Sequence, residues 1–201
     1  LDVNRMAEGH GFFQVGSSAI APDNNLLAFT EDPVGRRQYT LRIKNLATGE
    51  LLPDRIENVD PHVAWTADSR SILYLEKDPE TLLARRVLRH VLGTDPAGDA
   101  LVYEQDDDSF YTSVGSTKDE RYVTIFARST VSTEMRYADA ADPALKFRVF
   151  LPRERDLEYY PDHLDGRWII RTNWQPPHYR LMEATVVEES DRVPWRELLE
   201  D

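Results

Sequence analysis

The side chains of this sequence that could carry out chemistry are few and widely spaced. The chain has 201 residues, no cysteine, and five histidines: His10, His62, His90, His163 and His178. No two histidines have the His-x-x-x-His spacing that would place both imidazoles on one metal ion from a helix. We therefore predict structural roles for the histidines and neither a metal nor a cofactor, while a site assembled from distant loops stays open.

A serine nucleophile of the α/β-hydrolase type requires Gly-x-Ser-x-Gly, because a strained turn must hold the hydroxyl out between glycines. The segment Gly16-Ser17-Ser18-Ala19-Ile20 lacks the second glycine and is typical of a strand entry. Glycine-rich loops that cradle phosphate are also absent. The sequence therefore predicts no complete catalytic machinery within this chain.

The densest acidic run is Asp106, Asp107 and Asp108. Its oxygen atoms suit calcium or a basic peptide, but the alternating donors and the glycine of a calcium loop are missing. Adjacent like charges repel and prefer water, so we expect a solvated loop. We keep the three aspartates as candidates for a substrate-facing or interdomain surface.

A second charged motif, Arg36-Arg37, precedes Tyr39. Two neighbouring guanidinium groups can bind an anion, but in an acidic protein they more often pair with surface carboxylates. We therefore expect Arg36 and Arg37 to pair with surface carboxylates, with anion binding as the alternative.

The charge balance of the chain limits the classes of partner that it can bind. Thirty-six acidic against 24 basic side chains give a net charge of −12, which argues against a phosphate-binding surface and favours solubility or the attraction of cationic partners. We therefore expect no nucleic acid as ligand. No apolar run is long enough for a membrane span, and no signal peptide is visible after Leu1, where we expect an upstream segment to have been removed.

A fourfold repeat of roughly 50 residues positions these side chains. Each repeat has a turn that starts at an aspartate, namely Asp23, Asp68, Asp119 or Asp165, followed by a β-branched or aromatic run. A short apolar segment precedes each turn and two alternating segments follow, so each repeat predicts four antiparallel strands. The fold class predicted is all-β: a β-propeller fragment of about four blades, at 1–57, 58–106, 107–153 and 154–201, with an antiparallel sandwich as the alternative.

Three details follow from this pattern. Trp65, Val123 and Ile169 should be buried between blades. Residues 79–86 are the best candidate for a helical turn or two, and Pro176-Pro177 should mark a stiff turn.

Several segments, in order and spacing, carry a resemblance to a known family. They are Ala7-Glu8-Gly9-His10, Phe12-Phe13, Val15-Gly16, 18–29, Glu31-Asp32, 35–40, Leu92-Gly93-Thr94-Asp95, 107–111 and 149–153. The chain resembles the N-terminal propeller of oligopeptidase B, or protease II, in the prolyl oligopeptidase family of serine peptidases. The resemblance runs along essentially the whole chain.

The resemblance implies a seven-bladed propeller over a C-terminal α/β-hydrolase domain in a cytoplasmic enzyme that cleaves short basic peptides after lysine or arginine. The Ser, Asp and His of that domain would lie outside this chain, so we expect the chain alone to be inactive. A self-standing propeller for protein interaction is the alternative. Four blades cannot close a seven-bladed ring, so we also expect the isolated chain to form a homo-oligomer.

Overall fold

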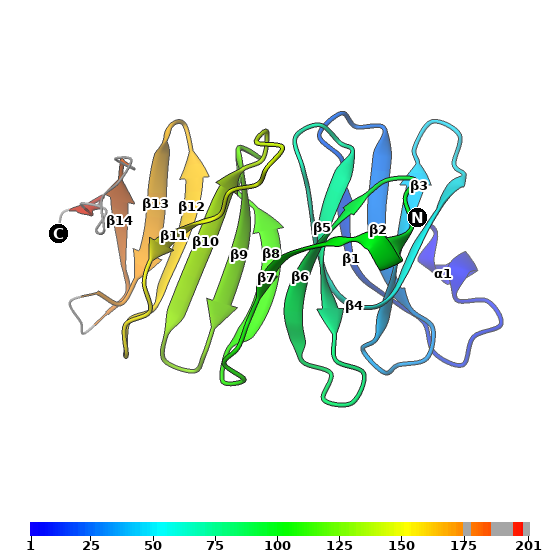
Figure 1. Ribbon diagram of the computed structural model, residues 1–201, viewed down its shortest axis with the longest axis horizontal. Helices are drawn as coiled ribbons and strands as arrows, with labels where there is room; N and C mark the ends of the chain where they lie inside the picture. Colours follow the sequence, from blue (N-terminus) through cyan, green and yellow to red (C-terminus); the bar gives the residue numbers. More distant parts are fainter. Residues whose placement is uncertain (175–177, 186–194, 199–201) are drawn as a thin grey trace. The chain divides into compact units, whose positions relative to one another are not determined.

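The computed structural model describes residues 1–174, 178–185 and 195–198, and nearly all regular structure in them is antiparallel β-sheet (Figure 1). The described part also has one short helix, α1 (Val3–Met6), and a 3₁₀ turn, η1 (Pro96–Gly98). No described helix has the length and apolar character needed to span a membrane. The chain divides into two compact units, Leu1–Gly115 and Ser116–Asp201.

In the first unit, seven strands form one sheet in sequence order. They are β1 (Gln14–Ile20), β2 (Leu26–Asp32), β3 (Tyr39–Asn45), β4 (Leu51–Trp65), β5 (Ser71–Lys77), β6 (Ala84–Val91) and β7 (Ala100–Glu104). The core cluster of this unit includes Leu41, Ile43, Trp65 and Ile72, all nearly inaccessible to solvent.

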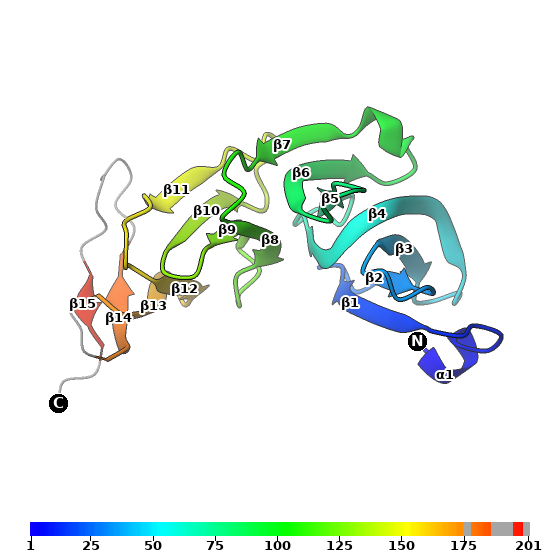
Figure 2. The same ribbon diagram turned by 90° about the horizontal axis from the view of Figure 1, so that it is seen from below.

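Strand β4 joins the first two predicted repeats without interruption. Its first part pairs with β3, where Ile56 lies opposite Leu41, and its last part pairs with β5, where Trp65 lies opposite Ile72. Figure 2 shows β4 as a long curved strand. The predicted boundary after residue 57 therefore lies inside a strand.

Strand β8 (Tyr111–Ser116) lies where the division between the two units falls. In the second unit, β9 (Tyr122–Arg128), β10 (Thr133–Asp139) and β11 (Arg148–Leu151) pair in the order β11-β10-β9. A four-stranded sheet follows, with β12 (Tyr159–Leu164), β13 (Arg167–Thr172), β14 (Arg180–Ala184) and β15 (Arg196–Glu197) in sequence order. Trp168, Tyr159 and Ile170 of this sheet share one core with Met135, Tyr137 and Phe150.

The predicted turns after the first strand of the first three repeats have a common backbone. Asn24, Ser69 and Glu120, each directly after the turn aspartate, have φ values of 60°, 57° and 59°. The amide of each donates to the carbonyl three residues earlier. Short polar side chains tolerate the left-handed region, which explains the Asp-Asn and Asp-Ser sequences at two of these turns.

The fourth turn differs and corrects one sequence prediction. Leu164 pairs with Arg167 across a two-residue turn in which Asp165 and Gly166 both have positive φ. This shorter turn shifts β13 by one residue relative to an alignment on the aspartates, and a shift of one residue exchanges the faces of a strand. Trp168 and Ile170 are therefore buried, while Ile169 is only half-buried on the opposite face. The predictions that Trp65 and Val123 are buried are confirmed.

The helical turn or two predicted at 79–86 is reduced to one turn, in which the Leu82 amide donates to the Asp78 carbonyl at 2.9 Å, and the low helical content is confirmed. Strand β6 begins at Ala84, and the Asp78 carboxylate accepts the amides of Glu80 and Thr81 to close a single turn. Leu82 follows with a φ of 61°, which ends any helical path. Pro176 and Pro177 lie outside the described residues.

Candidate functional site

The acidic run does not form a convergent site among the described residues. Asp106 and Asp108 are exposed, and Asp107 is half-exposed. The Asp107 carboxylate accepts the amide and the hydroxyl of Ser109, at 2.9 and 2.6 Å, so it caps a turn. Asp108 pairs with Arg85 at 2.8 Å. Within the part of the chain that the structure describes, no group of three or more acidic or histidine side chains could hold a metal ion.

The structure instead gathers three polar side chains, Asp54, Asp99 and Tyr74, around His90, a cluster that the sequence analysis missed. Nε2 of His90 lies 3.0 Å from Oδ1 of Asp54, and Nδ1 lies 2.9 Å from Oδ1 of Asp99. The Tyr74 hydroxyl donates to Asp99 at 2.9 Å, and the Gly93 amide donates to Asp54 at 2.6 Å. Both ring nitrogens lie within hydrogen-bonding distance of a carboxylate, so this network ties β4, β5 and β6 to the segment before β7.

Burial determines what the His90 network can do. The side chains of His90, Asp54 and Asp99 are only 1–3% exposed. Burial raises the pKa of Asp54, but the Gly93 amide and His90 outweigh it and hold that pKa below its usual range. With both ring nitrogens occupied and no access for a substrate, His90 is a structural residue.

The alternation of side chains between the two faces of a strand was the sequence signal that could have shown His90 to be buried. Leu88 and His90 are two residues apart in β6 and both are buried, which places His90 on an inward face. The Asp54 partner could not be identified from sequence, because it lies 36 residues away in the chain.

A similar contact joins the third and fourth repeats within the second unit. Nδ1 of His163, which is 3% exposed, lies 2.6 Å from Oδ2 of Asp119 in the preceding repeat. The ring also packs edge-on against Tyr122 and Trp168. Hydrogen bonding to His163 and Thr117 holds the pKa of Asp119 below its usual range against the effect of burial.

His62 differs from His90 and His163 because it is exposed. Its side chain is 58% exposed, and Nδ1 lies 2.8 Å from Oδ1 of Asp60, which raises the pKa of the imidazole. No serine nucleophile accompanies this pair in the described residues at a hydrogen-bonding distance. His62 and Asp60 therefore do not form a catalytic triad here.

The arginines of the second charged motif lie on the surface between β2 and β3. Arg36 and Arg37 are both exposed, and neither guanidinium has a carboxylate within ion-pair distance among the residues that the structure describes. The expectation that they pair with surface carboxylates of this chain is therefore not met.

Comparison with known proteins assigns the fold. The family model for the prolyl oligopeptidase N-terminal β-propeller domain matches residues 1–201. The chain belongs to this family. The propeller architecture predicted from the sequence is thereby confirmed, and the parent proteins of the family are peptidases.

Individual relatives of the propeller are considerably longer than this chain. It is 48% identical over 198 residues to dipeptidyl aminopeptidase BI of Pseudoxanthomonas mexicana, covering 98% of the chain and 27% of that protein. It is 28% identical to Protease 2 of Moraxella lacunata, covering 96% and 28%. The structure of oligopeptidase B from Leishmania major superposes with a TM-score of 0.82 at 27% identity, covering 92% of the chain and 26% of that structure. The chain therefore spans about a quarter of these relatives.

Proposed function

We propose that this chain is the propeller portion of a serine peptidase that hydrolyses short peptides after lysine or arginine. The observation that carries the proposal is the match of the whole chain to the family propeller, together with its likeness to Protease 2 and to oligopeptidase B. The net charge of −12 supports it, because an acidic wall attracts basic peptides.

In this role the propeller does no bond chemistry. A catalytic domain elsewhere in the longer protein would supply the serine, histidine and aspartate of acyl transfer. The propeller would restrict entry to short peptides, and that filter requires blades that do not separate easily. The indole of Trp65, which donates to the Ala19 carbonyl at 3.0 Å, and the His90–Asp54 contact provide such connections between the first two repeats.

A second candidate activity is favoured by one specific observation. The relative with 48% identity is named a dipeptidyl aminopeptidase, a peptidase that releases dipeptides from a free amino terminus. The two candidates differ in whether the substrate amino terminus must be free, so they can be separated by substrate design.

The test uses the full-length protein with two fluorogenic substrates. One is an arginyl amide with a blocked amino terminus, and the other is a dipeptidyl amide with a free amino terminus. Turnover of the blocked substrate, abolished by a serine-directed inhibitor, supports the oligopeptidase. Turnover of the free dipeptide alone supports the aminopeptidase, and no turnover of either contradicts both.

The isolated chain is the matched control for that assay. It contains no Gly-x-Ser-x-Gly segment, and positioning alone cannot lower an acyl-transfer barrier without a nucleophile. We expect no amide hydrolysis above background. Turnover that survives removal of contaminating proteases would overturn the assignment.

A self-standing propeller that binds other proteins is the alternative. It predicts a few further blades and then a stop codon, whereas the peptidase predicts a Gly-x-Ser-x-Gly segment downstream of residue 201. Sequencing the complete gene distinguishes the self-standing propeller from the peptidase. For the peptidase we also propose a cytoplasmic location, which cell fractionation with an antibody would test.

The acidic run remains our candidate for a face that meets substrate or the catalytic domain. Replacing Asp106 and Asp108 by asparagine should raise KM for arginyl peptides about two- to fivefold, because exposed charges act mainly through long-range attraction. Asp156→Asn is the control, since the Asp156 side chain is also exposed, at 74%. An equal effect of the control, or no effect of the double variant, would remove the acidic run from the site.

A further inference from the structure

Three aromatic rings and one guanidinium group lie in a row within the second unit. We call these residues, Phe126, Tyr160, Arg171 and Tyr179, the arginine stack. The Tyr160 ring stacks on the Phe126 ring, with the centroids 5.7 Å apart and the planes 9° from parallel. The guanidinium carbon of Arg171 lies 4.5 Å from the ring centroid of Tyr160 and 4.6 Å from that of Tyr179. Two cation–π contacts therefore hold the guanidinium group in place.

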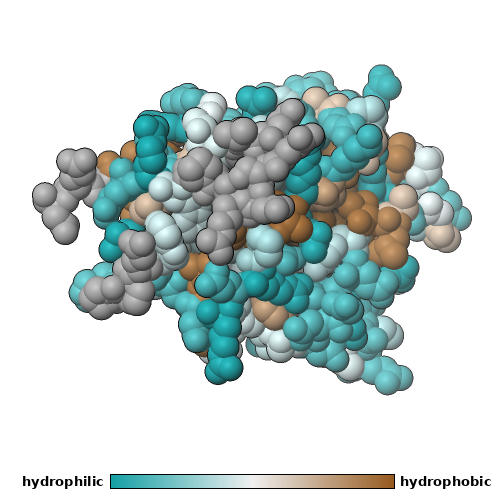
Figure 3. All heavy atoms as spheres, turned by 60° about the vertical axis from the view of Figure 1, so that its left-hand side comes forward, coloured by the Kyte–Doolittle hydropathy of each residue, from teal (hydrophilic) through white to brown (hydrophobic). Residues whose placement is uncertain are grey.

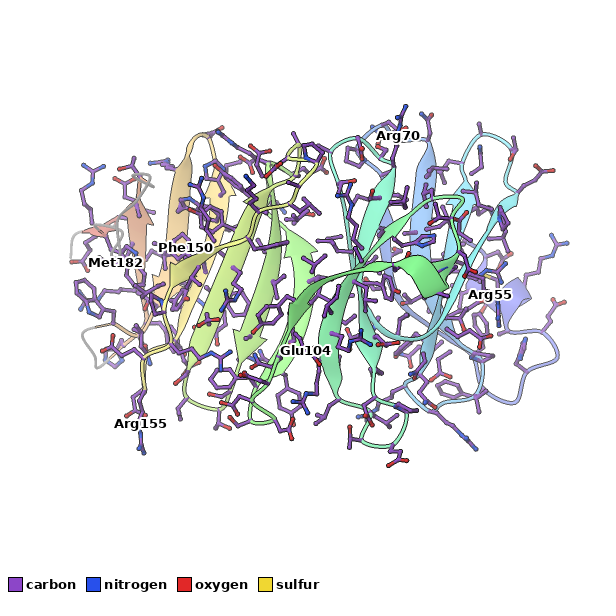
Figure 4. The ribbon with its side chains drawn as sticks, viewed as in Figure 1. Arg55, Arg70, Glu104, Phe150, Arg155 and Met182 are labelled. Atoms are coloured by element: carbon purple, nitrogen blue, oxygen red, sulfur yellow. The ribbon has the colours of Figure 1, made fainter. Side chains whose placement is uncertain are left out.

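The pairing of the last sheet brings the arginine stack together. Tyr160 of β12 pairs directly with Arg171 of β13, and Leu181 of β14 pairs with Arg171 from the other side. Tyr179 comes two residues before Leu181, so it follows the same face of the sheet. The opposite face carries the core, which includes Met182 of β14 (Figure 4). Since Arg171 is the last but one residue of β13, its guanidinium group lies at the end of this sheet.

The carboxylate of Glu158 orients the tyrosine rings and leaves Arg171 without a counter-charge. The Tyr160 hydroxyl donates to Oε2 of Glu158 at 2.9 Å. Burial and hydrogen bonding to Glu158 raise the pKa of Tyr160 to about 12, and the same two causes raise the pKa of Tyr179. Arg171 is exposed and forms no ion pair within the part of the chain that the structure describes. The stack therefore presents a fixed and uncompensated positive charge in a chain with a net charge of −12.

We propose that Arg171 binds the C-terminal carboxylate of the peptide substrate. A guanidinium group that stacks on aromatic rings keeps the N–H groups at its edge free, and two of these form paired, charge-assisted hydrogen bonds with one carboxylate. Every linear peptide has such a carboxylate whatever its sequence. The inference deepens the proposed function and rests on it, because that proposal supplies the peptide.

The position of the stack in the fold suits a ligand that enters from outside. The blades of a propeller surround a central channel, so an edge strand of each blade lies next to that channel. β12, which carries Tyr160, is one of the two edge strands of its sheet. Because the two rings already hold the guanidinium group, binding a carboxylate there costs little ordering entropy. The contact favours short peptides, whose C-terminus can reach Arg171 while another part of the peptide lies in the catalytic domain.

Binding of two matched peptides to the full-length protein tests the contact. A serine-directed inhibitor first inactivates the protein, so that bound peptide is not cleaved. Both probes are short fluorescent peptides of alanine, glycine and a single arginine, and they differ only in ending with a free carboxylate or with an amide. Fluorescence anisotropy should give a Kd about three- to tenfold lower for the free acid, because the amide lacks the charge and the second acceptor oxygen.

Variants of β13 identify the group that recognises the carboxylate. Arg171→Gln should make the two Kd values equal and leave the Kd of the amide unchanged, which also shows that the variant is folded. Arg171→Lys keeps the charge without the paired bonds, so the preference for the free acid should fall to about twofold. Arg167→Gln is the matched control and should keep the full preference: Arg167 is exposed on the same face of β13 but already pairs with Glu183, at 3.0 Å.

The outcomes separate this inference from the peptidase assignment. Equal Kd values in the unaltered protein, or a preference that persists in Arg171→Gln, overturn the carboxylate site even if the protein cleaves arginyl peptides. A preference that Arg171→Gln removes, in a protein without peptidase activity, supports the site and contradicts the peptidase assignment. If Arg171→Gln binds neither peptide, Arg171→Lys decides, since a full preference there overturns the proposal and a reduced one supports it. A comparable loss in Arg167→Gln shows a general charge effect and overturns the proposal.

Discussion

At the scale of single residues, Trp65 connects the first two repeats. It is 4% exposed, packs in the core of the first unit, and its indole donates to the Ala19 carbonyl of β1. Trp65→Ala should lower the free energy of unfolding by about 3–5 kcal/mol through cavity formation. Trp65→Phe should cost less, and Tyr111→Ala, at a side chain 70% exposed, should change it by less than about 0.5 kcal/mol. Chemical denaturation measures all three, and a loss below about 1 kcal/mol in Trp65→Ala would contradict this packing.

Asp54, another single residue, should make the stability of the folded protein depend on pH. Its pKa is lower in the folded protein than in the unfolded chain, so the unfolded state binds more protons in acid. The stability that Asp54 contributes is therefore present above its unfolded pKa, near 4, and is lost as the pH falls through the lower folded value. Asp54→Asn should lower stability at pH 7 by about 1–3 kcal/mol and flatten the decline below about pH 4. Denaturant midpoints from pH 3 to 7 measure this, with Asp156→Asn as control; an unchanged slope would refute the role of Asp54.

At the scale of elements, the close approach of β1 to its neighbours depends on Gly16. A Cβ atom there would lie 2.5 Å from Cε1 of Tyr39 and 2.7 Å from Cβ of Pro61. Gly16→Ala should therefore displace β1 and cost about 1–3 kcal/mol of stability. Gly11→Ala is the control, because a Cβ at Gly11 meets nothing within 4 Å. Thermal unfolding measures the stability of both variants. If Gly16→Ala melted at the same temperature as Gly11→Ala, β1 would not pack as closely on Tyr39 and Pro61 as the structure shows.

At the scale of the whole molecule, one face of the last sheet is partly exposed in the residues that the structure describes. Ile169 and Arg171 of β13 share this face with Leu181 of β14, which is 37% exposed, while the opposite face holds the core around Trp168. Figure 3 shows hydrophilic side chains over much of the visible surface, with apolar side chains among them. We expect the isolated chain to associate with itself through such faces. Light scattering measures this: Leu181→Asp should shift an oligomer toward monomer, and a strict wild-type monomer at tens of micromolar would contradict the expectation.

The sequence by itself determined the local structure of this protein. Alternating apolar residues at Tyr39, Leu41 and Ile43 predicted a strand with one buried face, and the turn aspartates predicted the hairpins, because both signals depend on neighbours in the chain. The fourfold order of these signals was sufficient to predict a propeller. The acidic run was also correctly placed in a solvated loop.

Only the tertiary structure decided which distant side chains meet. The shorter turn at Asp165 and Gly166 placed Trp168 rather than Ile169 in the core, because one residue of register reverses a strand. Strand β4 pairs first with β3 and then with β5, an arrangement in which Asp54 meets His90, and the end of β2 placed Asp32 against the backbone of residues 34–37. Periodicity reports which face of a strand is buried, but partners 36 residues apart depend on how strands pair and bend in space, which no local pattern encodes.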